Sequence, residues 1–277
     1  MGAMNALLRS AVILCALLLP GLPAVAENTA PRRETGARAA QGERYTGWAQ
    51  REAVQHADFP TGREMAELAR RSVAEVTPAV LRQTADDKLL AWLEAEYAIF
   101  RAIEQRVCDA QVHQKFANVE EFLDAAATIM NRRKSRAGHS LEHHVEFLLR
   151  ESGIAFEAQA TIDGKVRPDV LLPGKAAYDD AKHPAEKLAV LALKTTCKDR
   201  WRQILNEGKR VTVKDLLTLQ PAMSHAQLAE MHEAKVRLTV PAPLHDGYKV
   251  PDGVQILTVS ELIADLRRRF PQPASSR

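Results

Sequence analysis

Apolar residues recur at helical spacing through the first folded part of the chain, which we expect to begin near Tyr45. The pair Thr61 and Glu64 has the spacing of a capping box, in which each residue satisfies a free backbone N–H at the start of a helix. The basic run over residues 132–134 is expected to end one helix before the next begins. We therefore predict helices over residues 61–73, 86–112 and 119–130, and from 140 up to Gly153.

After Gly153 the pattern changes to short runs rich in valine, isoleucine and leucine that alternate with amphipathic stretches. The short runs predict strands over residues 154–160, 168–172, 188–194, 216–219, 236–240 and 254–259. The stretches between them predict helices over residues 199–208, 224–233 and 260–269. The expected fold class is α/β, a mixed sheet flanked by helices and preceded by an all-helical segment. We divide the folded chain into a helical segment over 45–135, a core over 136–270 and a tail over 271–277.

The first 26 residues have the pattern of an export signal. Arg9 supplies a positive start, residues 11–19 an apolar stretch, and residues 24–26 a cleavage site of small residues. The apolar stretch is too short to span a bilayer as a stable helix. A start codon assigned upstream of the true one explains the same pattern, so both interpretations stay open. Residues 27–44 are polar and lack apolar periodicity, which predicts a flexible linker.

Composition narrows the class of protein. The chain has 277 residues, of which 46% are hydrophobic and 26% charged, and this excludes disorder of the whole chain. Its 38 Lys and Arg residues nearly balance its 35 Asp and Glu residues, which excludes a uniformly basic protein that coats nucleic acid. A local basic patch stays compatible with this balance. The three cysteines are far apart in sequence, which predicts neither a disulfide framework nor a cysteine zinc cluster.

Two charged residues lie where the predicted strands begin or end. Asp169 follows Pro168 at the start of an apolar strand, and Lys194 ends the next strand. Alone, each is typical of an ordinary turn or of a solvated strand end. Together they supply an acid and a cation for metal-dependent hydrolysis of a phosphodiester, which requires at least two carboxylates. Position 192, where a second acid is often found, is alanine, so Glu207 on the following predicted helix is the candidate.

This arrangement resembles the variant of the PD-(D/E)xK nuclease motif in which the second acid has moved to the next helix. Longer strings resemble the catalytic domain of EcoRII-type restriction endonucleases, and the resemblance covers roughly Tyr45 to Phe270. The strings are FPTGREM (59–65), NRRKSRAGHSLEHH (131–144), KTTCKDRWRQILNE (194–207) and LLTLQ (216–220). The third string is long enough to be highly specific. The resemblance implies a restriction-endonuclease-like core.

The resemblance also implies roles for single residues. Asp169 and Glu207 would bind Mg²⁺, and Lys194 would orient or deprotonate the attacking water and stabilise charge on the phosphate. Glu142 resembles the acid on the helix before the core. Tyr178 resembles an active-site tyrosine of the family.

Two further features lie near these residues. Glu146, one helical turn after Glu142, competes with it for the same role. His143 and His144 are adjacent and point to different helix faces, so a zinc site is not predicted there.

The segment Lys198-Asp199-Arg200 resembles the triplet with which the family reads C·G base pairs. Lysine and arginine donate to guanine O6 and N7 in the major groove, and an acid accepts from cytosine N4. Lysine stands at the first position where relatives can have arginine, which makes a bidentate guanine contact there less secure.

Basic residues are concentrated in two stretches. Residues 131–136 contain Arg132, Arg133, Lys134 and Arg136 without an acid, and residues 194–210 contain six basic and two acidic residues. We expect Arg133, Lys134 and Arg136 to contact DNA phosphates.

The resemblance implies a Mg²⁺-dependent endonuclease for double-stranded DNA, acting at a CC(A/T)GG-like site and leaving 5′-phosphate and 3′-hydroxyl ends. It also implies a homodimer and a companion cytosine-5 DNA methyltransferase that protects host DNA. We expect a cytoplasmic protein with no membrane association in its mature form, with which the signal-like leader conflicts. The alternatives are a DNA-binding protein of the same fold that does not cleave, and an exported protein of unrelated function.

Full-length relatives carry an additional N-terminal domain that binds a second copy of the site. About 44 residues precede the catalytic part here, too few for such a domain. We therefore expect this chain to correspond to the catalytic half and to cleave single sites without an effector copy.

Overall fold

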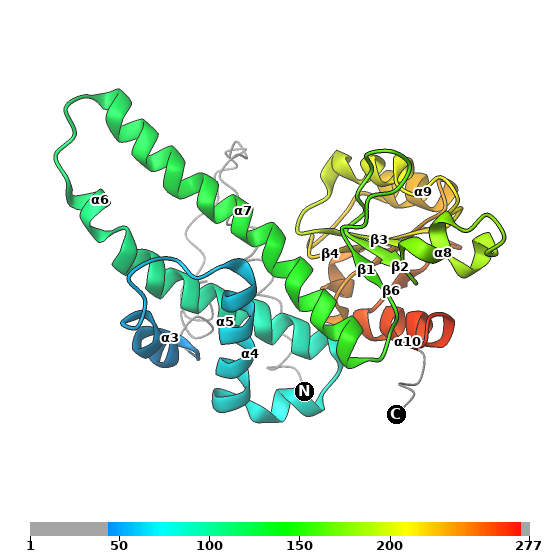
Figure 1. Cartoon of the computed structure of the whole chain (residues 1–277), viewed down its shortest axis with the longest axis horizontal. Coiled ribbons are helices and arrows are strands. Elements are labelled where there is room, and N and C mark those ends of the chain that lie inside the picture. Colours follow the sequence, from blue (N-terminus) through cyan, green and yellow to red (C-terminus); the bar gives the residue numbers. More distant parts are fainter. Residues whose placement is uncertain (1–43, 273–277) are drawn as a thin grey trace. The chain divides into compact units, whose positions relative to one another are not determined.

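The computed structural model describes residues 44–272, which form two compact units (Figure 1). The first unit contains the described residues up to Gln83 and Leu90–Ser140. The second contains Thr84–Leu89 and the described residues from Leu141 onward. The predicted leader over residues 1–26 lies outside the described residues, as do nearly all of the predicted linker and tail.

The first unit is built from helices. They are α3 (Thr46–Ala53), α4 (Gly62–Val76), the 3-10 helix η1 (Pro78–Arg82), α5 (Ala85–Val107), α6 (Asp109–His113) and α7 (Val119–Glu151), of which α5 and α7 extend into the second unit. The predicted capping box is confirmed: the Thr61 hydroxyl accepts from the Glu64 N–H, and the Glu64 carboxylate accepts from the Thr61 N–H. The expected helix over 86–112 is interrupted, because α5 ends at Val107 and α6 begins at Asp109. Large buried side chains between these helices include Tyr45, Trp48, Met65, Trp92, Phe100 and Ile103.

Helix α7 corrects the sequence analysis. A break was predicted between residues 130 and 140, but α7 is one continuous helix of 33 residues (Figure 1). The basic run does not end it, since Arg133 forms two hydrogen bonds of 2.7 Å with Glu104, and Arg136 lies 2.5 Å from Glu96. Both partners are buried on α5, so the basic residues hold α7 against α5. No helix between residues 44 and 272 is long and apolar enough to cross a membrane.

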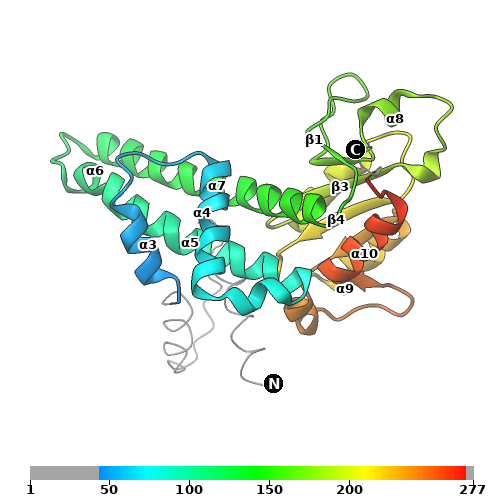
Figure 2. The ribbon, with the colours of Figure 1, turned by 60° about the horizontal axis from the view of Figure 1, so that its bottom comes forward.

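The second unit contains a six-stranded mixed sheet, which confirms the expected α/β fold class (Figure 2). The strands follow the sheet in sequence order, with antiparallel pairs β1–β2 and β2–β3 and parallel pairs from β3 to β6. The strands are β1 (Glu157–Ala158), β2 (Val170–Leu172), β3 (Ala189–Lys194), β4 (Lys214–Thr218), β5 (Val236–Thr239) and β6 (Ile256–Leu257). The helices are α8 (Lys175–Asp179), η2 (Ala185–Lys187), η3 (Lys198–Asn206), α9 (His225–Glu233), η4 (Ala242–Gly247) and α10 (Val259–Arg269).

The predicted elements of this unit differ from the structure mainly at their ends. The first and last expected strands are only two residues long, and Val259 begins a helix instead of ending a strand. Helix η3 is a 3-10 helix. The buried Asp86 was expected only as the start of a helix, yet its carboxylate accepts hydrogen bonds from the Ala242, Val259 and Ser260 N–H groups. It thereby places a negative charge at the N-terminus of α10, where the helix dipole favours it.

The continuity of α7 gives a stability prediction. Gly138 lies inside α7, and a Cβ added there meets no atom within 4 Å. We expect Gly138→Ala to raise the free energy of unfolding by about 0.5–1 kcal/mol, because alanine loses less conformational entropy in a helix. Urea unfolding followed by circular dichroism measures this. The control Gly153→Ala should lower stability, since Gly153 has φ +66°. A destabilised Gly138→Ala would indicate that the helix does break here.

Candidate functional site

The pairing of β2 with β3 brings two of the predicted residues together. Val170 pairs with Leu191, so Asp169 lies at the end of β2 opposite the last residues of β3. Asp169 Oδ2 accepts hydrogen bonds from Lys194 Nζ at 2.8 Å and from the Leu193 N–H at 2.7 Å. The two side chains are only 12% and 17% exposed. A buried pair of this kind holds both groups in one orientation, because either charge left alone would be poorly solvated.

Glu207 is the third member of this group. It does not lie on the helix as predicted, because η3 ends at Asn206 and Glu207 follows in an extended conformation. Burial raises the pKa of its carboxyl above the usual range, Lys194 lowers it, and Asp169 raises it again. The next residue, Gly208, packs against Val190 of β3, on the face of the strand that also presents Lys194. Its Oε2 atom is buried and accepts no hydrogen bond from the described residues.

These residues fit a hard divalent cation. Glu207 presents a buried carboxylate oxygen that has no hydrogen-bond partner between residues 44 and 272 as far as these are described, and Asp169 supplies a second carboxylate. Mg²⁺ is usually held by one or two carboxylates, with water and substrate phosphate completing its shell. A closed site of three or more histidine, cysteine or carboxylate ligands is absent from the described residues. The arrangement therefore suits an open site that a phosphate completes.

Tyr178 is buried on the short helix α8 and belongs to an apolar cluster with residues of β2 and β3. Its hydroxyl donates to Asp163 Oδ2 at 2.8 Å, and its backbone carbonyl accepts from the Arg210 guanidinium. Burial and the bond to Asp163 raise the pKa of the phenol. The structure thus ties Tyr178 to the loop that follows Glu207, and its expected catalytic role stays a prediction.

The two acids predicted on α7 differ in their surroundings. The Glu146 carboxylate is nearly buried and accepts from Arg150 at 2.6 Å. Glu142 is half-buried one turn earlier. Glu146 is thus paired with a residue of its own helix, and the role of either acid stays a prediction.

The predicted base-reading triplet begins η3. The side chains of Lys198 and Asp199 lie outside the described residues, and Arg200 is exposed. Gln220, two residues after the end of β4, holds Cys197, the residue before the triplet: its Oε1 accepts from the Cys197 N–H at 3.0 Å. The start of η3 is therefore held in place beside the strand end that carries Lys194.

The predicted phosphate contacts divide into two kinds. The guanidinium groups of Arg133 and Arg136 are engaged with Glu104 and Glu96, whereas Lys134 is exposed. Contact of these residues with DNA stays a prediction, for which Lys134 is the most accessible.

Two residues of this region were missed by the sequence analysis. Lys214 is 5% exposed, and burial lowers its pKa although Glu207 and Asp163 raise it. Asp163 accepts from the Lys209 N–H at 2.8 Å as well as from Tyr178. The available signal was a lysine at the start of the apolar run that forms β4.

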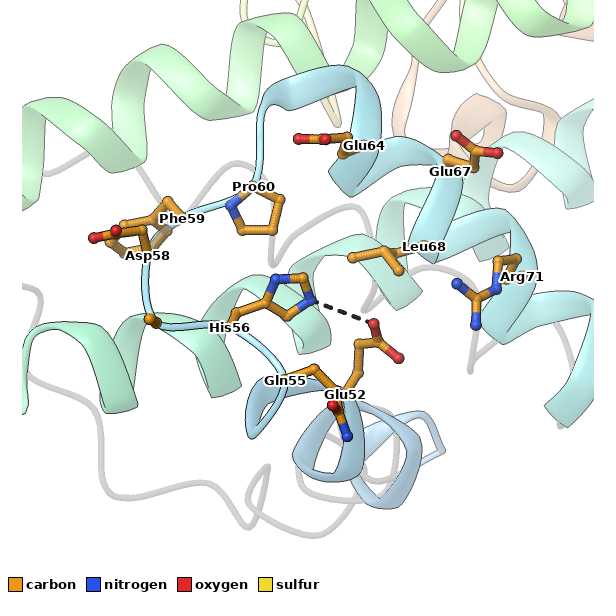
Figure 3. A pocket seen from close by; sticks show the side chains of 11 residues that line it. Glu52, Gln55, His56, Asp58, Phe59, Pro60, Glu64, Glu67, Leu68 and Arg71 are labelled. Carbon is orange, nitrogen blue, oxygen red and sulfur yellow. Dashed lines mark hydrogen bonds and ion pairs between the residues drawn. The ribbon is translucent and has the colours of Figure 1, made fainter.

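A cavity of about 590 Å³ in the first unit contains none of these residues (Figure 3). Four carboxylates line it, and that of Glu52 lies 3.3 Å from Nε2 of His56. The others belong to Asp58, Glu64 and Glu67. The excess of carboxylates over His56 and Arg71 makes this cavity unsuited to a phosphate.

The fold is that of the restriction endonucleases. The structure of a restriction endonuclease PspGI–substrate DNA complex matches with a TM-score of 0.63 at 15% identity, covering 76% of this chain and 93% of that one. Metal-depleted Ecl18kI in complex with uncleaved, modified DNA matches with a TM-score of 0.60 at 18% identity, covering 83% and 84%. Both similarities concern the fold alone.

The chain belongs to the EcoRII C-terminal family, whose model matches residues 100–263. The type II restriction enzyme EcoRII of Escherichia coli is 41% identical over 212 residues, which are 76% of this chain and 51% of that enzyme. The type II restriction enzyme SsoII of Shigella sonnei is 26% identical over 151 residues, 50% of this chain and 48% of that enzyme. The chain thus spans about half the length of these relatives.

The buried Oε2 atom of Glu207, which has no hydrogen-bond partner among the described residues, predicts a stabilising substitution. Because the folded state raises the pKa of Glu207, its ionised form weakens the fold above that raised pKa, and the cost disappears below the ordinary pKa of glutamate. In metal-free buffer at about pH 8, we expect Glu207→Gln to raise the free energy of unfolding by about 1 kcal/mol or more. The gain should shrink toward about pH 4. Urea unfolding at both pH values measures it.

The matched control is Asp169→Asn. It removes the charge that pairs with Lys194 and should lower stability at the higher pH. A Glu207→Gln variant less stable than the wild type at this pH would show that the carboxylate is satisfied in the fold.

Proposed function

We propose that this chain is a Mg²⁺-dependent, sequence-specific endonuclease for double-stranded DNA. The observation that carries the proposal is the hydrogen-bonded pair of Asp169 and Lys194 at one end of β3, with Glu207 next to Gly208, which packs on the same face of that strand. One carboxylate oxygen there is buried without a partner among the described residues. Membership in the EcoRII C-terminal family, and the relatives described as type II restriction enzymes, support the same chemistry.

In this proposal Asp169 and Glu207 hold the Mg²⁺ ion. The bound ion would polarise the scissile phosphate and lower the pKa of a water molecule. Lys194, oriented by its 2.8 Å bond to Asp169, neutralises charge on the phosphate and orients the attacking water. The water oxygen bonds to phosphorus as the bond to the 3′ oxygen breaks. The attacking water gives up a proton to solvent, the 3′ oxygen takes one up, and the products are a 5′-phosphate and a 3′-hydroxyl.

We further propose that Lys198, Asp199 and Arg200 read C·G pairs in a CC(A/T)GG-like site. Such a site is nearly palindromic, so two symmetric copies of the chain would each cut one strand as a homodimer. A nuclease that cuts this sequence also requires a companion cytosine-5 methyltransferase to protect the host genome.

The direct test of cleavage uses plasmid DNA that contains CC(A/T)GG. We expect wild-type protein to linearise it with Mg²⁺ and to leave it intact with EDTA. Asp169→Ala and Lys194→Ala should each lower the rate at least about 100-fold, because they remove charge stabilisation at the reacting phosphate. The measurement is gel electrophoresis, with end labelling to identify the 5′-phosphate.

The control is DNA binding in EDTA, measured by fluorescence anisotropy on duplexes with and without the site. Both variants should still prefer the duplex with the site. Asp169→Ala, which removes a negative charge, should bind at least as tightly as the wild type, and Lys194→Ala should bind more weakly. Wild-type protein that binds the site but leaves it uncut across a range of Mg²⁺ concentrations would establish the alternative, a DNA-binding protein of the same fold.

We also propose that the protein acts in the cytoplasm, beside the DNA that it would encounter. The competing interpretation rests on the signal-like residues 1–26. Mass spectrometry of the N-terminus of protein isolated from cells distinguishes them. A start near or after Met4 without cleavage is expected, whereas Glu27 as the first residue would establish export.

A further inference from the structure

The segment that follows Glu207 is fastened by a buried ammonium group. Lys214 Nζ donates to the backbone carbonyls of Glu207 at 2.5 Å, Gly208 at 3.0 Å and Val211 at 2.9 Å. An ammonium has three N–H donors and no acceptor, so these three carbonyls satisfy it completely. We call residues 207–211 the Glu207 loop.

Further contacts hold the other side of the Glu207 loop. The Lys209 N–H donates to Asp163 Oδ2 at 2.8 Å, and Asp163 adopts a left-handed conformation with φ +47° at a loop tip. The Arg210 guanidinium donates to the carbonyls of Asp180 at 2.9 Å and His183 at 2.6 Å. The loop is thus joined to segments that lie before β2 and after α8.

The loop also packs tightly on the sheet. Gly208 has φ +66°, and a Cβ added there would lie 2.8 Å from Cγ2 of Val190. Val190 and Lys194 are both on β3, an even number of residues apart, so their side chains share one face of the sheet. The loop therefore lies over the face of β3 that also presents Lys194.

We infer that Lys214 is a positioning residue for Glu207, which fixes the Glu207 loop so that the carboxylate faces Asp169 and Lys194. Glu207 Oε2 accepts no hydrogen bond from the described residues, so no hydrogen bond to this oxygen fixes the position of the side chain. Its placement must come from its backbone, and Lys214 binds that backbone directly. This inference rests on the proposed function only in taking Glu207 as a ligand of the divalent ion.

The test uses the full chain and Mn²⁺, which substitutes for Mg²⁺ and is visible by electron paramagnetic resonance. We expect Lys214→Met to raise the dissociation constant for Mn²⁺ at least about tenfold, as loss of a group that orients a metal ligand does. Hydrogen exchange of the amides in residues 208–211 should accelerate about tenfold in metal-free buffer, because the loop loses three hydrogen bonds. The amides of β3 should stay unchanged.

Lys187→Met is the matched control, since Lys187 is exposed and lies outside both the loop and the acids. It should leave Mn²⁺ binding and exchange unchanged. If Lys214→Met does not fold, Lys214→Arg replaces it. A planar guanidinium cannot meet the three carbonyls as the ammonium does, so the same rise in the Mn²⁺ dissociation constant is expected. Faster exchange of the loop with unchanged Mn²⁺ affinity would overturn the inference, as would unchanged exchange.

Glu207→Gln separates this inference from the proposed function. If it weakens Mn²⁺ binding as Lys214→Met does, while the wild type fails to cleave DNA, the positioning role stands and the endonuclease proposal fails. If Glu207→Gln leaves Mn²⁺ affinity unchanged, Glu207 is not a ligand and the positioning role toward the metal fails, whatever the cleavage assay shows.

Discussion

The antiparallel pairing of β2 with β3 is the constraint on which the site depends. Its register, Val170 opposite Leu191, places Asp169 where it accepts from both the Leu193 N–H and Lys194 Nζ. Side chains alternate between the faces of a strand, so a slip by one residue would turn Asp169 away from Lys194. All of β2 and the first five residues of β3 are buried, so the same slip would exchange the side chains that pack on the two faces of the sheet. The same strand register therefore sets both the packing of the core and the geometry of the charged group.

The three charged residues of the site differ in how well their hydrogen-bonding groups are paired. Asp169 and Lys194 form a pair with additional hydrogen bonding, whereas Glu207 brings a second negative charge into a buried position. Burying this second carboxylate costs free energy. Hydrogen bonds from Lys214 and to Asp163 hold the backbone of the Glu207 loop in place despite that cost. An acid that is poorly satisfied by the protein is available to a cation, which is the arrangement that a metal-dependent hydrolase requires.

The sequence was sufficient for those parts of the structure that depend on local pattern. The capping box at Thr61 and the strands that carry Asp169 and Lys194 follow from spacing and hydrophobicity alone, and the mixed sheet followed from the alternation of elements. The continuity of α7 did not follow, because its basic run is neutralised by acids on α5 that lie about 29 and 40 residues earlier. The role of Lys214 did not follow from the sequence either, because its burial is explained only by the backbone carbonyls that accept from it in the folded chain.

The ion pairs on α7 also change how the charge of the chain must be counted. Arg133 and Arg136 appear in the sequence as part of a strongly basic stretch, yet Glu104 and Glu96 neutralise them inside the protein. Binding to a polyanion is driven largely by release of the small cations condensed on it, and only a side chain that exchanges with those cations contributes. A count of lysines and arginines therefore overstates the number of cations that this helix could displace. In the described part of the chain, Arg133 and Arg136 are paired with acids, whereas Lys134 is exposed and Arg132 contacts Cys108 and the ring of Phe59.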